Sequence, residues 1–297
     1  MEISIPAGYA TLTGISGVWQ MIPVPGRSQK RHKDMKLHET LQKSSEQFGE
    51  SVIQEESKLG GTVRIRVSDG SEAYISVNLG KDLSSAFESG EFSASVADGM
   101  FRNICPGDYI TREVSVPEAT SVGGGAHTIK FIIADLDSAL GHGVTEHHVA
   151  IVPETPYFDA PMNLKSTNAG GYAGSYMQST VMPAFASMLS AAFGVSHLLR
   201  FTVEGLPCTC RLMTYSMVFG KSLPDFKKDN CLDGKQFAAF RLKPDLMGKG
   251  IGPYWLSDVA LNSSENFAYV NSLMDCVFWG SSEASHAIGV RPFALIV

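Results

Sequence analysis

The closing stretch of the chain, residues 254–297, constrains the fold more than any other. It holds three short apolar runs rich in aromatic and β-branched residues, at 254–259, 267–270 and 289–297, with Asn, Ser and Gly between them. Runs of this kind are typical of strands joined by loops. Because the sequence finishes on an apolar run, we expect its last residues to lie inside a sheet and within the core.

The composition is that of a globular protein. A hydrophobic share of 44% and a charged share of 18% over 297 residues allow a full core. The net charge of −6 gives no overall field that would attract nucleic acid. The basic run between positions 27 and 36 has few aromatic residues beside it, so we interpret it as a solvated linker, with nucleic-acid binding as the alternative.

Neither a secretory signal nor a membrane span is expected. The first residues lack a basic leader followed by an apolar segment. The apolar stretch 181–199 is interrupted by Ser187, Gly194 and His197, and its periodicity predicts a buried helix. We therefore expect a soluble protein without membrane insertion.

Cysteine usage indicates neither a disulfide framework nor a metal site. The five cysteines, at positions 105, 208, 210, 231 and 276, are odd in number and have no repeated spacing, which suits a reducing cytosol. Cys208 and Cys210 lack the second pair of ligands that a structural zinc site needs. No metal and no cofactor are expected.

The N-terminal region predicts an arm followed by a helix. Residues 1–26 are apolar but broken by Pro and Gly, which indicates an extended arm that must bury itself against its own domain or a neighbouring subunit. Residues 34–59 have a thin apolar stripe at helical spacing, which suits a helix packed on a partner surface, either as a stalk or oligomerisation element or laid on its own domain. The candidate assembly residues on these two segments are Ile3, Ile5, Tyr9, Trp19, Leu37, Leu41 and Phe48.

Several further elements follow from local patterns. Alternation at 62–67 and 73–77 around Asp69 and Gly70 predicts a β-hairpin. A short helix is expected at 83–87, strands at 128–134 and 146–152, and a core segment at 212–219. A longer helix is expected from an N-cap at Ser175 to Phe193, ended by Gly194; Pro183 either kinks it or marks a later start.

Potential acid–base or metal-binding groups are densest between positions 135 and 148. They are Asp135, Asp137, His142, Glu146, His147 and His148. Within a strand, His147 and His148 would point to opposite faces, so they would not line one site. We interpret the set as structural hydrogen bonding, with a metal or catalytic site as the alternative.

An ordered series of motifs resembles a known family. The series is GDYI at 107–110, the blocks IADLD, EHHVAIVP and MNLKSTNAGGYAGSYM between 133 and 177, LMTYSMVFG at 212–220, and the closing YWLSDV and GVRPFALIV. It resembles the C-type-lectin-like domain of phage structural proteins and gut-bacterial surface proteins, which is more loosely similar to the formylglycine-generating-enzyme fold and to diversified phage receptor-binding proteins. The resemblance covers residues 98–297.

The resemblance implies a C-type-lectin-like domain over residues 98–297. With the N-terminal arm, the helix and the β-hairpin predicted from the local patterns, the expected fold is α+β, with this domain preceded by those three elements. The corresponding division is 1–60, 61–97 and 98–297. Ser257 departs from the arginine that this family often carries, which puts the family's polar network in doubt. The calcium motifs of true C-type lectins and the reactive cysteine pair of the formylglycine enzymes are not found in the sequence.

The resemblance also implies a function. We expect a non-enzymatic phage virion structural protein that displays its lectin-like domain for host-surface or receptor binding, as a fibre tip, or as capsid or tail decoration. The alternatives are a purely architectural virion assembly protein and a metal-dependent or formylglycine-enzyme-like enzyme. Expected partners are other virion proteins, further copies in a homo-oligomer with a trimer as first guess, and a host-surface glycan or protein. The expected location is the virion, after synthesis in the host bacterial cytoplasm.

Loops over a rigid scaffold are the usual place for binding residues. The candidate ligand-binding residues are Asp258, Asn262, Glu265, Asn266, Trp279, Glu283 and His286. An aromatic ring among short polar groups suits a sugar or protein surface. The alternative for each residue is a core or solvated position.

Overall fold

The computed structural model describes residues 9–15, 18–23, 61–66, 72–77, 80–116, 124–203, 206–221, 225–227, 234–273 and 276–297. For the four strands before residue 80, and for residues 206, 272–273 and 276–279, the description covers the backbone. The chain divides into two compact units, residues 1–81 with 102–105 and residues 82–101 with 106–297.

The first unit contains two antiparallel hairpins. Strand β1 (Tyr9–Ile15) pairs with β2 (Val18–Pro23), and β3 (Gly61–Arg66) pairs with β4 (Glu72–Val77). The second hairpin confirms the prediction from alternating residues. The described parts of the arm, 9–15 and 18–23, are extended as expected, but they also pair with each other, which an irregular Gly and Pro pattern does not indicate.

The candidate assembly residues are only partly described. Tyr9 lies on β1 and Trp19 on β2. Ile3, Ile5, Leu37, Leu41 and Phe48, together with the helix expected at 34–59, lie outside the described residues. Their role in oligomerisation stays a prediction.

The second unit is built on an antiparallel five-stranded sheet in the order β11-β17-β7-β6-β5. The strands are β5 (Tyr109–Val116), β6 (Gly125–Leu136), β7 (Val149–Pro153), β11 (Cys210–Leu212) and β17 (Pro292–Ile296). β17 is buried at all five positions and lies between β11 and β7, which confirms that the last residues belong to the core. β7 starts at Val149, three residues later than the sequence predicted, so the expectation that His147 and His148 lie within a strand is wrong.

A second sheet has six strands, in the order β15-β14-β13-β16-β8 with β12 also paired to β13. Its strands are β8 (Asp159–Ala160), β12 (Phe226–Lys227), β13 (Tyr254–Ala260), β14 (Asn266–Leu273), β15 (Cys276–Glu283) and β16 (Ile288–Gly289). β13 runs parallel to β16 and antiparallel to its other neighbours. The buried Trp255 of β13 donates its indole N–H to the carbonyl oxygen of Ala160 on β8, at 2.8 Å, and so links these two strands, which lie on either side of β16.

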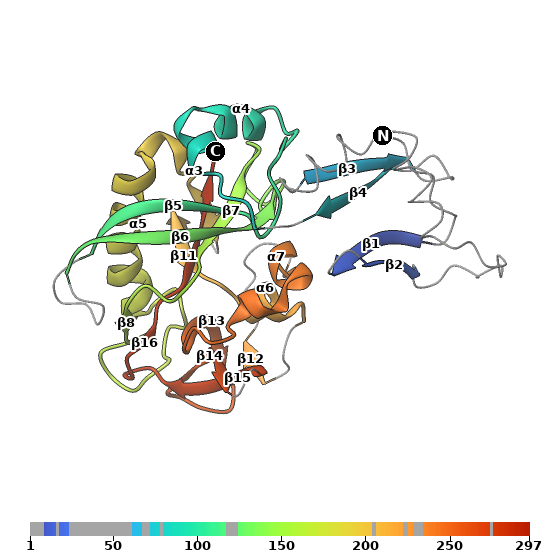
Figure 1. The fold of residues 1–297 in the computed structure, drawn as a ribbon. Coiled ribbons are helices and arrows are strands. Elements are labelled where there is room, and N and C mark those ends of the chain that lie inside the picture. Colours follow the sequence, from blue (N-terminus) through green and yellow to red (C-terminus); the bar gives the residue numbers. More distant parts are fainter. Residues whose placement is uncertain are drawn as a thin grey trace. The chain divides into compact units, whose positions relative to one another are not determined.

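The longest helix, α5 (Met182–Phe193), lies along one side of the five-stranded sheet (Figure 1). A π-helical turn, η1 (Met177–Val181), leads into it, and Pro183 sits in its first turn, where a missing N–H is tolerated. Ser175 accepts a hydrogen bond from the Gln178 amide at 3.1 Å, and Gly194 ends the helix, as predicted. On the inner face of α5, Phe193 makes an edge contact with Phe131 of β6 at a ring distance of 5.0 Å.

The remaining elements are short. They are α3 (Ser84–Glu88), α4 (Glu91–Ala97), η2 (Val195–His197), β9 (Phe201–Val203), β10 (Leu206–Cys208), α6 (Tyr215–Phe219), α7 (Ala238–Leu242) and η3 (Pro244–Met247). α3 matches the helix expected at 83–87, whereas α4 was not expected. Both helices belong to the second unit, whose first residue is Asp82.

One hydrophobic core joins the two sheets. Its buried residues come from the five-stranded sheet, from the six-stranded sheet and from α6 and α7; examples are Ile132, Val152 and Leu295, then Tyr254, Leu256 and Val270, then Val218 and Phe240. Burying each side chain of this size contributes about 1.5–3 kcal/mol, so the shared core strongly favours the observed placement of the sheets.

A buried arginine links η3 to this core. Arg291 is fully buried and donates to the carbonyl oxygens of Pro153 (2.8 Å), Met247 (3.0 Å) and Leu246 (2.9 Å). Its guanidinium also lies 5.0 Å from the ring centre of Tyr254, whose hydroxyl donates to the same Met247 oxygen. A planar group with five N–H donors can satisfy several carbonyls at once, which explains an arginine in the core.

The fold is therefore α+β, as predicted. Across the described ranges, none of the helices combines the length and hydropathy that a membrane-crossing segment would need.

Candidate functional site

Three loop segments meet at one end of the six-stranded sheet; we call them the loop surface. They are residues 163–168, the β13–β14 turn at 260–266, and residues 281–286, which comprise the end of β15 and the turn after it. Backbone hydrogen bonds join them in pairs, from Asn168 N to Ser264 O at 2.8 Å and from Ala284 N to Glu265 O at 2.8 Å. A third, from Asn163 N to Ala284 O at 2.9 Å, closes the set.

The side chain of Asn168 fixes the turn within this surface. Its amide nitrogen lies 3.2 Å from the carbonyl oxygen of Ala260, 2.7 Å from that of Ser263 and 3.1 Å from that of Asn266. In the sequence, Asn168 stands within the block MNLKSTNAGGYAGSYM, where no local pattern indicates this role. Asn side chains commonly pair with turn backbone, but the partners here are more than ninety residues away and only the fold identifies them.

Five of the seven predicted ligand-binding residues lie on the loop surface. Asn262, Glu265, Glu283 and His286 are exposed, and Asn266 is half-buried and donates to Ser281 Oγ at 3.3 Å. Glu283 accepts a hydrogen bond from Ser166 Oγ at 3.1 Å, and Ser282 Oγ lies 3.0 Å from His286 Nδ1. The surface thus presents carboxylate, amide, hydroxyl and imidazole groups from three connected segments.

The remaining two predicted residues are placed elsewhere. Asp258 is wrong as a surface ligand, because it is only 6% exposed and accepts a 2.6 Å hydrogen bond from the backbone N–H of Tyr215. Its neighbour Ser257 is also buried and bonds to Met213 O through its amide at 3.0 Å. Trp279 lies on β15, where its backbone pairs with Val270 of β14. Its side chain lies outside the described residues.

The loop surface also carries two exposed leucines that sequence reasoning missed. Leu164 is 72% exposed and Leu261 is 62% exposed, on two of the three joined segments. The sequence around each leucine does not indicate that the two lie on the same surface; the fold brings them together. Large apolar side chains next to polar groups are suited to contact with another macromolecule.

The group between Asp135 and His148 forms a local hydrogen-bond network. Asp137 accepts from the backbone N–H of His148 at 3.0 Å, and its other oxygen lies 2.8 Å from Nδ1 of His147. His147 thus reaches this carboxylate through its ring and His148 through its backbone amide, and both residues precede β7 in irregular backbone.

His148 is a neutral structural residue in this network. Its Nε2 accepts the backbone N–H of Ala139 at 2.9 Å, so Nδ1 carries the proton and donates to the carbonyl oxygen of Glu146 at 2.9 Å. Burial lowers the pKa of His148, which keeps the ring uncharged. Within the described ranges, no three His, Cys, Asp or Glu side chains gather as a metal ion would require.

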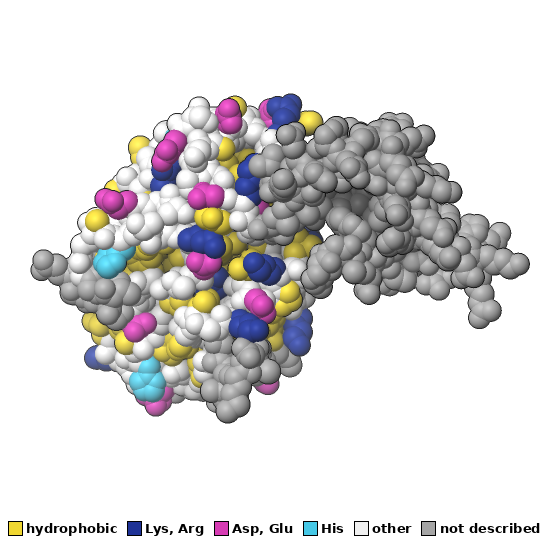
Figure 2. Space-filling model, viewed as in Figure 1, with side chains coloured by type: hydrophobic (Ala, Val, Ile, Leu, Met, Phe, Trp, Pro, Cys, Tyr) yellow, Lys and Arg dark blue, Asp and Glu magenta, His cyan; other side chains and the backbone are white. Residues whose placement is uncertain are grey.

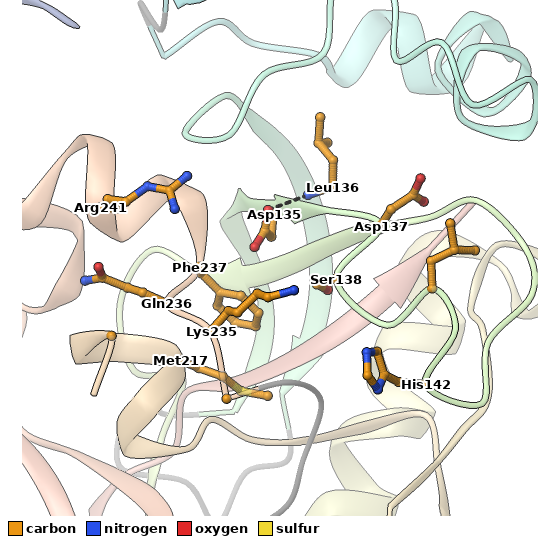
Figure 3. A pocket seen from close by; sticks show the side chains of 13 residues that line it. Asp135, Leu136, Asp137, Ser138, His142, Met217, Lys235, Gln236, Phe237 and Arg241 are labelled. Carbon is orange, nitrogen blue, oxygen red and sulfur yellow. Dashed lines mark hydrogen bonds between the residues drawn. The ribbon is translucent and has the colours of Figure 1, made fainter. Parts of the chain in front are cut away.

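Asp135, which lies outside that network, lines a cavity of about 560 Å³ (Figure 3). The cavity lies between the end of β6 and its following loop, the end of α6, residues 234–237 and α7. Asp135, Ser138 and Lys235 are directed into it, beside the apolar side chains of Met217 and Phe237. Burial raises the pKa of Asp135, against hydrogen bonds from the amides of Leu136 and Ala238 and the nearby charges of Arg241 and Lys235.

The two described cysteines of the 208–210 pair bond to backbone. Cys208 Sγ lies 3.5 Å from Phe201 O, and Cys210 Sγ lies 3.4 Å from Met182 O. Burial raises the pKa of Cys210, so its thiol is protonated near neutral pH. A protonated thiol is not a metal ligand or a strong nucleophile.

Charges on the visible face of the second unit are mixed. Figure 2 shows Lys and Arg interspersed with Asp and Glu over the described residues of that face, rather than gathered by sign. A mixed surface of this kind gives no electrostatic track for a phosphate backbone.

Comparison with known protein families, with curated proteins and with solved structures finds no match to this chain. Arguments about its function therefore rest on its own residues and geometry.

Proposed function

We propose that this chain is a non-enzymatic structural protein of a bacteriophage particle, with a lectin-like second unit that contacts the host surface or decorates the head or tail. The loop surface is the observation that carries the proposal. It combines exposed Glu265, Glu283 and His286 with loops that are cross-linked by backbone hydrogen bonds and by Asn168.

Such a surface is suited to recognition rather than to chemistry. Binding sites are most selective when their side chains are held by a rigid frame. The loop surface has this frame in β13, β14 and β15, and its acidic, amide and imidazole groups can orient a sugar or a protein. The motif series supports the virion setting, other virion proteins as partners and a homo-oligomer, for which a trimer is the first guess.

Location on the particle is tested first. Purified particles are expected to contain the protein by mass spectrometry and to be labelled by antibodies against it. A protein that is expressed in infected cells but missing from purified particles would contradict the virion proposal.

Host contact is tested with the full-length protein and a matched pair of variants. The variant E265Q/E283Q/H286A is expected to lose binding to host cells, whereas K243M/D245N, which changes exposed residues at η3, is expected to bind as the wild type does. Equal binding by both variants would reject the loop surface as the contact site.

A purely architectural role is the second candidate, and the exposed Leu164 and Leu261 favour it. In that case the variant L164D/L261D is expected to prevent incorporation into particles, and E265Q/E283Q/H286A is expected to incorporate and to leave host attachment unchanged. Normal incorporation of L164D/L261D would argue against the architectural reading.

A further inference from the structure

We propose that the cavity lined by Asp135, Ser138 and Lys235 is a binding site for a neutral, polyhydroxylated molecule of the size of a monosaccharide. This site is separate from the loop surface, and it does not depend on a virion location. Its volume of about 560 Å³ lies within the range of small-molecule sites.

The polar groups of the cavity supply both hydrogen-bond acceptors and donors. Asp135 receives the Leu136 amide at 2.9 Å and the Ala238 amide, but a carboxylate has about four lone-pair sites, so it can accept further hydroxyl groups. Lys235 carries only donors. A ligand with several hydroxyl groups can donate to the first and accept from the second.

An unsatisfied hydroxyl group adds to this set. Ser138 Oγ is buried and has no hydrogen-bond partner among the described residues. A buried polar atom without a partner costs free energy, and a rotation about χ1 can redirect a serine hydroxyl. A ligand hydroxyl in the cavity would supply the missing partner.

The charges of the cavity select a neutral ligand. Asp135 and Asp137 line the cavity together with Lys235 and Arg241, and both cations act electrostatically on Asp135. The two carboxylates and the two cations therefore largely offset one another within the protein. An anionic ligand would meet the Asp135 carboxylate, and a cationic ligand would meet Lys235 and Arg241. A zwitterionic ligand would have to separate these protein charges before it could pair with them.

The apolar part of the lining suits a sugar ring. Met217 and Phe237 line the cavity together with the polar groups (Figure 3). The C–H faces of a pyranose can pack on such side chains while its hydroxyl groups reach Asp135 and Lys235.

Titration of the full-length protein with glucose, galactose, mannose and N-acetylglucosamine, followed by saturation-transfer NMR and calorimetry, tests the proposal. At least one of these sugars is expected to bind, and glucuronate and glycine are expected to bind more weakly. D135N and K235M should each weaken binding by about tenfold, the effect of losing one hydrogen bond to a charged group. K243M, which changes an exposed lysine outside the cavity, should bind as the wild type does.

Chemical-shift mapping on the isotope-labelled wild type covers the case in which D135N does not fold. The amides of Asp135, Ser138 and Gln236 are expected to shift on addition of the bound sugar. The proposal is overturned if none of the four sugars binds, if glucuronate or glycine binds more tightly than all of them, if K235M binds like K243M, or if the shifts are confined to residues 260–286.

Discussion

The carboxylate of Asp258 accepts a 2.6 Å hydrogen bond from the backbone N–H of Tyr215. This bond joins β13 of the six-stranded sheet to the first residue of α6, at a place where both residues are buried. Asp258 therefore links β13 to α6 within the core and does not belong to the loop surface.

Removing this carboxylate is expected to destabilise the second unit. D258A leaves the buried Tyr215 amide without that acceptor, which costs about 1–3 kcal/mol. D258N keeps one acceptor oxygen and should cost less. Urea unfolding monitored by circular dichroism gives both values, and a D258A protein as stable as the wild type would disprove the structural role.

The Asn168 side chain is expected to control the order of the β13–β14 turn. N168A removes the contacts to Ala260, Ser263 and Asn266, so backbone amides at 260–266 should exchange with deuterium faster by hydrogen-exchange mass spectrometry. N262A changes an exposed residue of the same turn and serves as the control. Similar exchange in the two variants would contradict the prediction.

Replacing Arg291 with lysine is expected to destabilise the fold strongly, although the positive charge is retained. A lysine ammonium cannot reproduce the planar set of bonds to Pro153, Leu246 and Met247, so buried carbonyl groups lose their donor. We expect R291K to lower the free energy of unfolding by about 3 kcal/mol. R200K, at an exposed position, should change the free energy of unfolding little. Chemical denaturation measures both variants, and equal destabilisation by R291K and R200K would contradict the prediction.

His148 is expected to make stability depend on pH. Burial lowers its pKa in the folded chain below the ordinary value of 6.5. Between the two pKa values the unfolded chain binds a proton that the folded chain does not, so stability falls as the pH drops below about 6.5. The nearby Asp137 opposes this effect and His147 adds to it.

Variants separate this contribution from those of other groups. H148Q should be less stable than the wild type at neutral pH, but its urea midpoint should change less between pH values of about 7.5 and 5.5. H142Q, at an exposed position of the same loop, should keep the wild-type pH dependence. An unchanged dependence in H148Q would show that another group titrates.

Local patterns in the sequence were sufficient for many elements. The hairpin of β3 and β4, the cap at Ser175, the stop at Gly194 and the buried β17 each depend on neighbours within a few residues, and each was predicted. Such signals act through turn chemistry and side-chain periodicity, which do not require knowledge of the fold.

Relationships across the chain were not predictable in this way. Asp258 stands between Ser257 and Val259 in a strand, and nothing near it in the sequence indicates the Tyr215 amide as a partner. Because β7 starts three residues later than the sequence predicted, the His147 ring and the His148 backbone amide both bond to the Asp137 carboxylate. The cavity gathers Asp135 and Lys235, a hundred positions apart, through the packing of α7 on β6.

The central place of β17 affects the order of events during synthesis. β7 pairs with β17, yet roughly 140 residues are added between the two strands, which takes roughly 7–28 s at a translation rate of about 5–20 residues per second. Throughout that interval β7 has an unsatisfied edge of the kind that invites pairing with other chains, and β11 has one from the time it is made. The nascent chain is therefore prone to misassembly until residues 292–296 have left the ribosome and can pair with β7 and β11.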